Sequence, residues 1–284
     1  MKVAILGTGM AGLVAAHAVY TKDQSATIVL YGVNREPLPS GARWYEREIP
    51  GVNVMKRMVK TESAGDPKNY GVKLGGPVSE YFRARPDFLA FDYWDANMEL
   101  WKGYGDNIIQ LDPDFEMISE SLWDDCDFVI NTTPRPNFYE TSEHGMFAAT
   151  RHWRIDESGN TDEPTNPYRN ILPGNQDKNL MIFDGTEDSS WFRITQVFGL
   201  MSVEWGFHQK PPIAGSYVEI LPLTVPKEMD LKDTVPGWKG TKALAHVGAV
   251  ARWKPSTDVG EVFGDVTRVL EGDFGDDDSR GRDS

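Results

Sequence analysis

Residues 3–13 read VAILGTGMAGL, and this stretch predicts the fold of the first part of the chain. Its leading apolar residues are typical of a short buried strand, which runs directly into a glycine-rich turn. Residues 14–20 then have a helical composition, and residues 27–31 (TIVLY) form a second β-rich run. Strand, glycine turn, helix and strand within about thirty residues make up the βαβ unit of a dinucleotide-binding fold.

The turn matches the pattern G-x-G-x-x-G, in which each glycine has a separate task. Gly7 permits the tight turn, Gly9 lets the backbone approach a pyrophosphate, and Gly12 lets the helix pack close to the strand. The anion then lies at the helix N-terminus, where N–H groups and the helix dipole attract negative charge. The alternative is a glycine-rich turn with a purely structural role. The predicted dinucleotide contacts in this turn are Gly7, Gly9, Met10, Ala11, Gly12 and Leu13.

The end of the second β-rich run departs from the usual pattern. An acidic residue is expected there to hold the adenosine ribose, but Tyr31 stands in its place. Glu36 lies close enough along the chain to substitute for it, whereas Arg35 would favour a 2′-phosphate. We count Tyr31 among the predicted cofactor contacts, and NADPH stays open as a ligand.

Composition and charge exclude several classes of protein. The 284 residues include 29 Lys and Arg against 43 Asp and Glu, a net charge of −14. This charge disfavours tight binding to a nucleic-acid backbone and leaves only a local contact, for instance with a modified nucleotide. The single cysteine, Cys126, excludes an internal disulfide, and the five histidines lack the spacing of metal ligands. We therefore predict no metal site.

The sequence also predicts a cytoplasmic protein. No apolar stretch reaches the roughly 18 residues that a membrane span requires, and the first residues lack the layout of a signal peptide. Residues 273–284 consist of Gly, Asp, Arg and Ser with almost no apolar content, so we expect an acidic, disordered tail.

Further along the chain, β-rich runs predominate. Helices are expected around residues 93–100 and over residues 258–270. The expected strands lie at residues 127–131, 179–183, 191–198, 201–205, 217–223 and 243–250. Four of these strands fall between residues 151 and 239, which suggests a second layer or small domain inserted into the first.

The form G-x-G-x-A-G-L at residues 7–13 resembles the FAD-binding turn of the flavoprotein group that contains amine oxidases and UDP-galactopyranose mutase. Residues 248–254 (GAVARWK) and 258–262 (DVGEV) are similar to the closing motif of those enzymes. There, a glycine-led strand runs under the flavin and a helix N-terminus faces the ring. Weaker similarities point to the mutase and to compact flavin oxidoreductases encoded by bacterial viruses. They lie at residues 183–186 (FDGT), 191–193 (WFR) and Gly199 for the mutase, and at residues 41–51 and 127–134 for the viral enzymes.

The resemblance implies an α/β protein with a Rossmann-like domain for FAD or NAD(P), formed by residues 1–150 and 240–272, and a β-rich substrate domain at residues 151–239. FAD is the implied cofactor, with the N–H groups at residues 257–259 directed at the flavin's pyrimidine edge. Such donors would favour the anionic reduced flavin. Plain N-capping by Thr257 is the alternative. Beyond the glycine turn, the implied cofactor contacts are Arg43, Trp44, Gly248, Arg252, Trp253, Thr257, Asp258 and Val259.

Three residues are candidates for the chemistry. Trp191 and Arg193 lie in the predicted substrate strand, where alternation places them on one face, so that they would stack on and clamp a planar or anionic substrate. The alternative pairs Arg193 with an acid such as Glu204. His246 is a candidate proton shuttle, or else a packed residue of the interior.

These residues and the resemblance imply an FAD-dependent oxidoreductase that removes a hydride from a small substrate, with a slight preference for an amine. One alternative is a redox-neutral, flavin-dependent sugar-nucleotide mutase. Another is a dinucleotide-binding subunit of a modification complex that has no turnover of its own. If the chain is encoded by a phage, its location is the host cytoplasm.

Overall fold

The structure is a computed structural model. It describes residues 1–32, 43–74, 86–110, 126–133, 147–155, 179–206, 217–222, 243–248, 251 and 258–272. Several predicted features lie outside the described residues, namely Arg35, Glu36, Arg252, Trp253, Thr257 and the tail at residues 273–284.

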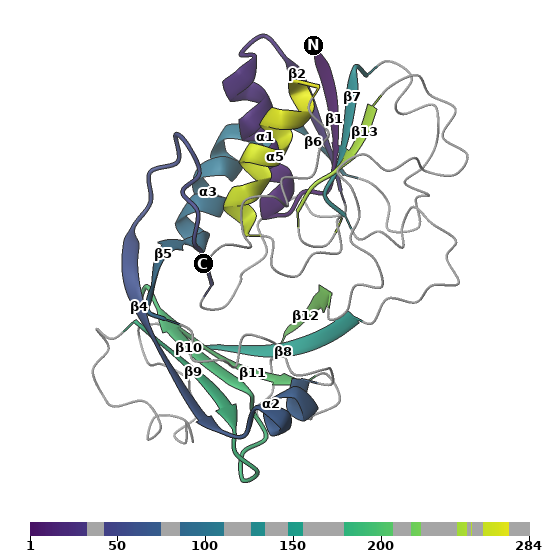
Figure 1. Ribbon diagram of the computed structural model, residues 1–284. Helices are drawn as coiled ribbons and strands as arrows, with labels where there is room; N and C mark the ends of the chain where they lie inside the picture. The colour runs from purple at the N-terminus through teal and green to yellow at the C-terminus, as the bar shows by residue number, and fades with distance from the viewer. Residues whose placement is uncertain are drawn as a thin grey trace, which may run out of the picture.

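The predicted βαβ unit lies at the centre of a five-stranded parallel sheet (Figure 1). The strand order is β13 (Ala243–His246), β7 (Phe128–Asn131), β1 (Lys2–Leu6), β2 (Thr27–Gly32) and β6 (Ile108–Gln110). Leu6, at the end of β1, pairs with Tyr31 on one side and Asn131 on the other, and Asn131 pairs with His246. The carboxyl ends of four strands therefore meet at one edge, next to the glycine turn.

Three helices gather beside this sheet and bury their apolar faces against it (Figure 1). They are α1 (Met10–Lys22), α3 (Tyr93–Tyr104) and α5 (Val259–Leu270), and a short 3-10 helix (Gly105–Asn107) follows α3. The shared core contains Val3 and Ile5 of β1, Leu13 of α1, Leu100 of α3 and Val266 of α5, all buried. Burial of apolar area on this scale is the main term that holds the layer together.

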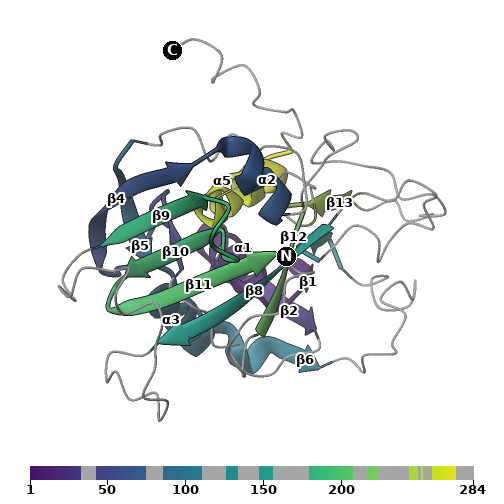
Figure 2. The ribbon, with the colours of Figure 1, turned by 90° about the horizontal axis from the view of Figure 1, so that it is seen from below.

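The second sheet has eight strands and lies below the parallel sheet in the view of Figure 1; Figure 2 shows it from below. Neighbouring strands are antiparallel except for β4 and β9, which are parallel. Helix α2 (Pro67–Leu74) follows β4 directly. The strand order is β12 (Tyr217–Pro222), β8 (Phe147–Ile155), β11 (Leu200–Gly206), β10 (Arg193–Val197), β9 (Leu180–Gly185), β4 (Lys56–Gly65), β5 (Phe88–Asp92) and β3 (Trp44–Tyr45).

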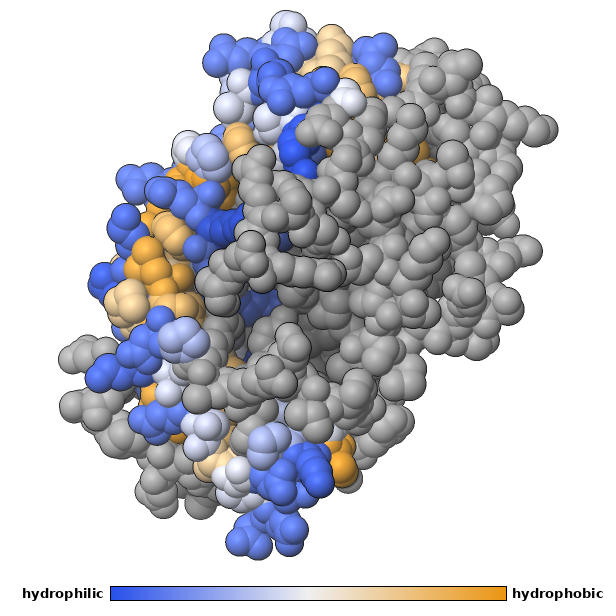
Figure 3. All heavy atoms as spheres, in the orientation of Figure 1, coloured by the Kyte–Doolittle hydropathy of each residue, from blue (hydrophilic) through white to orange (hydrophobic). Residues whose placement is uncertain are grey.

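The α/β class and the Rossmann-like layer are as predicted, but the second sheet draws on more of the chain than residues 151–239. Strands β3, β4 and β5 belong to it although they lie between residues 44 and 92. Periodicity does not reveal β4, because only Val59 of its ten residues is buried. The exposed side includes Met58 and Leu89, which pair across β4 and β5, and apolar atoms are visible over these strands in Figure 3.

Candidate functional site

The glycine turn has the close packing that its pattern predicts. Gly7 has a φ of 110°, which favours glycine, and its N–H donates to the Tyr31 carbonyl over 2.8 Å. A Cβ atom on Gly12 would lie 2.0 Å from the Gly7 carbonyl oxygen, so only a glycine lets α1 begin so close to the turn. The structural tasks predicted for Gly7 and Gly12 are confirmed.

Gly9, in contrast, faces open space at the start of α1. It is the N-cap residue in an extended conformation, and no side chain of the described residues caps it. The first turn of α1 contains no acidic residue, and a Cβ atom on Gly9 would meet no described atom within 4 Å. The first N–H groups of a helix have no partner inside the helix, so this position has the donors and the room for an anion.

The side chains around the turn contribute differently from one another. Met10 and Leu13 are buried in the core, so only their backbone is available to a ligand. The ring of Tyr31 is also buried, and burial raises the pKa of its phenol. A Cβ atom at Gly32 would lie 2.5 Å from the Thr8 hydroxyl, which excludes an acidic side chain at that position as well.

The segment after β7 supports the glycine turn through hydrogen bonds that the sequence did not predict. Thr132 donates from both its N–H and its hydroxyl to the Leu6 carbonyl, over 2.8 and 2.7 Å. Its hydroxyl lies where a side chain on Gly7 would have to go, 2.3 Å from the Cβ position. Asn131 accepts from the N–H and the hydroxyl of Thr133 through Oδ1. The sequence signals here were the expected strand at residues 127–131 and the weak similarity of residues 127–134 to the viral enzymes.

His246 is packed in the interior at the same sheet edge. It is fully buried, and its Nδ1 lies 3.0 Å from Nδ2 of Asn131. Because Oδ1 of Asn131 accepts twice from Thr133, Nδ2 is the donor and Nδ1 of His246 the acceptor. The proton of the neutral ring is then on Nε2. The geometry is that of the packed alternative rather than of a shuttle open to solvent.

The N-terminus of α5 is closed by its own cap residue. Asp258 accepts from the N–H of Gly260 over 2.8 Å, and its backbone carbonyl accepts from Glu261. The same carboxylate accepts from the N–H groups of Glu46 and Arg47, over 2.8 and 3.2 Å. A Cβ atom on Gly260 would lie 2.1 Å from the Arg47 carbonyl, so this segment packs directly on the helix end.

The cap residue of α5 is Asp258, and the N–H groups of Gly260 and Glu261 donate to it. The predicted flavin contacts of Thr257, Asp258 and Val259 stay a prediction, and Thr257 lies outside the described residues. Burial raises the pKa of Asp258, against the opposite effect of the three backbone donors. Asp92 caps α3 in the same way, accepting from Trp94 and Asp95. Of the three helices beside the parallel sheet, α1 alone begins without a carboxylate.

Trp44, predicted as a cofactor contact, and Arg193, predicted as a substrate contact, lie close together in the second sheet. The guanidinium of Arg193 lies 5.9 Å from the ring centroid of Trp44, and that of Arg43 lies 5.5 Å from the ring of Tyr93. Arg193 also forms a bidentate ion pair with Glu204, in which Nε and one terminal nitrogen of the guanidinium donate over 2.6 and 2.5 Å. The pairing with Glu204, given by the sequence as the alternative, is the one observed.

Trp191 does not share a face with Arg193, contrary to the prediction. Strand β10 begins at Arg193, so the alternation assumed from residue 191 onward does not apply. Trp191 is buried in a cluster with Ile194 and Trp205, whereas Arg193 lies over the ring of Phe192 in a different cluster. The two side chains therefore do not form one clamp.

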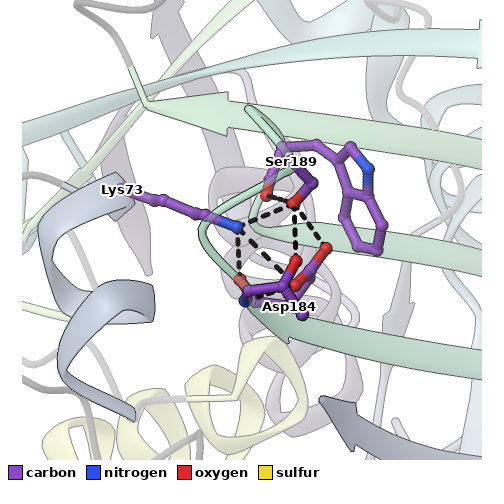
Figure 4. Close-up of polar contacts among 5 residues, drawn as sticks. Lys73, Asp184 and Ser189 are labelled. Carbon is purple, nitrogen blue, oxygen red and sulfur yellow. Dashed lines mark hydrogen bonds and ion pairs between the residues drawn. The ribbon is translucent and has the colours of Figure 1, made fainter. Parts of the chain in front are cut away.

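A buried polar cluster joins α2 to the turn that precedes β10 (Figure 4). Nζ of Lys73 donates to Ser189 over 2.8 Å and to the Asp184 carbonyl over 3.1 Å, and Ser189 donates to the Asp184 carboxylate over 2.5 Å. Burial lowers the pKa of Lys73, while Asp184 raises it. The donors and acceptors satisfy one another, so the cluster pins α2 to the second sheet. No pattern in the sequence predicted this cluster.

Other kinds of site are not observed in the described part of the chain. It contains no group of three His, Cys, Asp or Glu side chains placed to hold a metal ion. None of its helices is long and apolar enough to cross a membrane.

Comparisons with known proteins bear on the fold. No protein-family model and no curated protein sequence matches the chain. The crystal structure of CtdE in complex with FAD and substrate 4 matches with a TM-score of 0.55 at 12% identity, covering 95% of this chain and 80% of CtdE. FqzB matches at 0.52 and 10% identity, covering 95% and 75% of the two chains. A tryptophan 6-halogenase, SttH from Streptomyces toxytricini, matches at 0.51 and 10% identity, covering 97% and 72%. At these identities the likeness concerns the fold.

Proposed function

We propose that the protein is an FAD-dependent oxidoreductase acting on a small molecule. The observation that carries the proposal is the start of α1, where, among the described residues, nothing fills the space in front of Gly9 and no carboxylate occupies the helix N-terminus. A diphosphate fits such a position because backbone N–H groups and the helix dipole both favour negative charge. CtdE, which has a similar fold, was crystallised with FAD.

The residues of the turn would hold the cofactor in two different ways. The N–H groups of the first turn of α1 would bind the diphosphate, while Gly7, Gly12 and Thr132 keep the turn in place. Gly248 has a φ of 86° and packs against Ala11, so the C-terminal part of the chain reaches the same place. Bound FAD would supply the capacity to take up and release two electrons, and the protein would supply position and shelter.

The substrate would bind on the side of the second sheet, near Trp44 and Arg193. Two donor groups of Arg193 are used by Glu204, which argues against Arg193 as the clamp of an anionic substrate. An uncharged, planar molecule suits an ion-paired guanidinium and an indole ring better. An amine in its neutral form remains our finer proposal for the substrate, and a modified nucleotide is a second one. A cytoplasmic location also remains a proposal.

The first test is the absorption spectrum of the purified protein together with mass spectrometry of the nucleotide released on denaturation. We expect flavin bands and FAD. A colourless protein that binds NADPH and not FAD would contradict the cofactor and favour the dinucleotide-binding subunit. If FAD is bound, anaerobic mixing with a panel of amines should bleach the flavin band. Activity on a sugar nucleotide only after prior reduction, without a net electron acceptor, would instead indicate a mutase.

A further inference from the structure

Helices α1 and α5 present their N-termini side by side. Gly248 lies between their first turns, and a Cβ atom on it would be 3.3 Å from Ala11 and 3.5 Å from Val262. At the other end of the helices, Lys22 pairs with Glu271 over 2.6 Å. The two helices therefore run in the same direction, and both positive dipole ends lie at the carboxyl edge of the parallel sheet. Two such ends together would attract anions at either position.

The two ends are nevertheless not equivalent. Among the described residues, the start of α1 has no capping side chain, whereas the start of α5 carries the partly buried carboxylate of Asp258. The backbone of residues 46 and 47 covers the start of α5 from outside, and Arg47 pairs with Glu261 over 3.2 Å. Asp258 thus places a negative charge at the start of α5, and the backbone of residues 46 and 47 fills the space next to it.

We propose that Asp258 is a specificity-determining residue that closes the N-terminus of α5 to anions. Of these two helix N-termini, that of α1 is then the position for a diphosphate. The proposal rests on the proposed function, because it concerns the same cofactor site. It goes further in assigning Asp258 a role that opposes anion binding, where a helix N-terminus by itself would assist it.

The expected size of the effect follows from the spacing of the helices. Packed helices lie about 8–10 Å apart, so the carboxylate acts on a neighbouring anion over roughly that distance. With an effective dielectric constant between those of the protein surface and of water, one charge at this range changes anion affinity by about two- to tenfold. Salt should reduce the effect, because the Debye length is about 8 Å at physiological ionic strength.

Calorimetric titration with three probes tests the proposal. FAD, ADP and inorganic pyrophosphate are titrated into the full-length protein and into the variants Asp258→Asn and Asp258→Ser. Both replacements keep a side chain that caps helices well while removing the charge. The matched control is Asp23→Asn, which changes the net charge equally but lies at the other end of α1. Each titration is run at low and at high salt.

We expect both Asp258 variants to bind all three probes about two- to tenfold more tightly at low salt, with less gain at high salt, and Asp23→Asn to gain less than about twofold. Unchanged or weaker affinity in both variants, or an equal gain in Asp23→Asn, would overturn the role of Asp258. A parent protein that binds pyrophosphate but not FAD, with the expected gain in the variants, would leave this role standing and refute the proposed function. A parent protein that binds none of the probes would refute both.

Discussion

Helices α1 and α5 begin next to each other, but their first turns are built in opposite ways. Among the described residues, the start of α1 has a glycine cap with open space in front of it, while the start of α5 has a partly buried carboxylate and the backbone of residues 46 and 47 in contact. The hydrogen-bonding need is the same in both, since each helix leaves its first N–H groups without helical partners. In α5 the carboxylate of Asp258 meets part of that need, and in α1 no described side chain does, which leaves those N–H groups to the diphosphate that we propose. An uncapped helix start is therefore more informative about binding than a helix start as such.

Placing a carboxylate on α1 should have the largest effect on this difference. Gly9→Asp would give α1 the kind of cap that α5 has, and the backbone at Gly9 tolerates a side chain because its φ is −75° and the Cβ position is open. We expect FAD binding to weaken by at least about 100-fold, through both occupied N–H groups and charge repulsion. Fluorescence titration of FAD measures it.

Gly9→Ser separates the two causes, since serine caps the helix without adding charge. Its FAD affinity should fall by about fivefold only, because a capping hydrogen bond is worth roughly 1 kcal/mol. The melting temperature of both variants should equal or exceed that of the parent protein. Parental FAD affinity in Gly9→Asp would show that the diphosphate does not bind at α1.

Disrupting the contact between the start of α5 and residues 46–47 should have an intermediate effect, which is on the stability of the fold. In Gly260→Ala the new methyl group would meet the Arg47 carbonyl at 2.1 Å, so the helix or the segment at residues 46–47 must shift. We expect the free energy of unfolding to fall by about 1–3 kcal/mol, the usual cost of overpacking. Urea denaturation measures this change.

Gly264→Ala is the matched control within the same helix, because a Cβ atom on Gly264 meets nothing within 4 Å. Alanine is the better helix former there, so this variant should gain about 0.5–1 kcal/mol. Equal effects of the two substitutions would mean that the contact between Gly260 and Arg47 does not close the helix end.

The smallest expected effect is a pH dependence. Burial raises the pKa of Asp258 above its ordinary value of 3.8. The contribution of this group to the free energy of unfolding is therefore largest below pH 3.8, and it falls as pH rises through the raised pKa. The free energy of unfolding of Asp258→Asn, relative to the parent, should therefore increase as pH rises from about 4. Urea denaturation across pH 3–7 follows this difference.

Asp23→Asn should show the opposite trend. The hydroxyl and the N–H of Ser25 donate to Asp23 and lower its pKa, so the parent gains stability from this group as pH rises toward 3.8. The variant then loses stability relative to the parent over the same range. The same sign in both variants would contradict the burial of the charge on Asp258.

Local sequence predicted the centre of the fold well. The run from residue 3 to residue 31 sets strand, turn, helix and strand through composition and three glycines, because each element there is short and locally encoded. The strand at residues 128–131 and the helices at 93–104 and 259–270 were recognisable for the same reason. Asp258 was named as a cofactor contact, but its sequence position could not show that its carboxylate turns back on its own helix.

Features that depend on which segments meet were missed or misread. The pairing of β3, β4 and β5 with the second sheet, the support of Gly7 by Thr132 and the cluster around Lys73 all join residues more than about twenty positions apart, and nothing local marks them. The prediction that Trp191 and Arg193 share a face assumed a strand that begins at residue 191, whereas β10 begins at Arg193. Strand ends are the part of a strand that sequence patterns locate least well.

The amino-acid sequence by itself thus determined that a glycine turn opens a helix at the edge of a parallel sheet, since glycine's backbone freedom is a local property. Only the tertiary structure decided which of two neighbouring helix ends is available to a ligand. That choice depends on the carboxylate of Asp258 and the backbone of residues 46 and 47 arriving at one of them, and on nothing arriving at the other among the described residues.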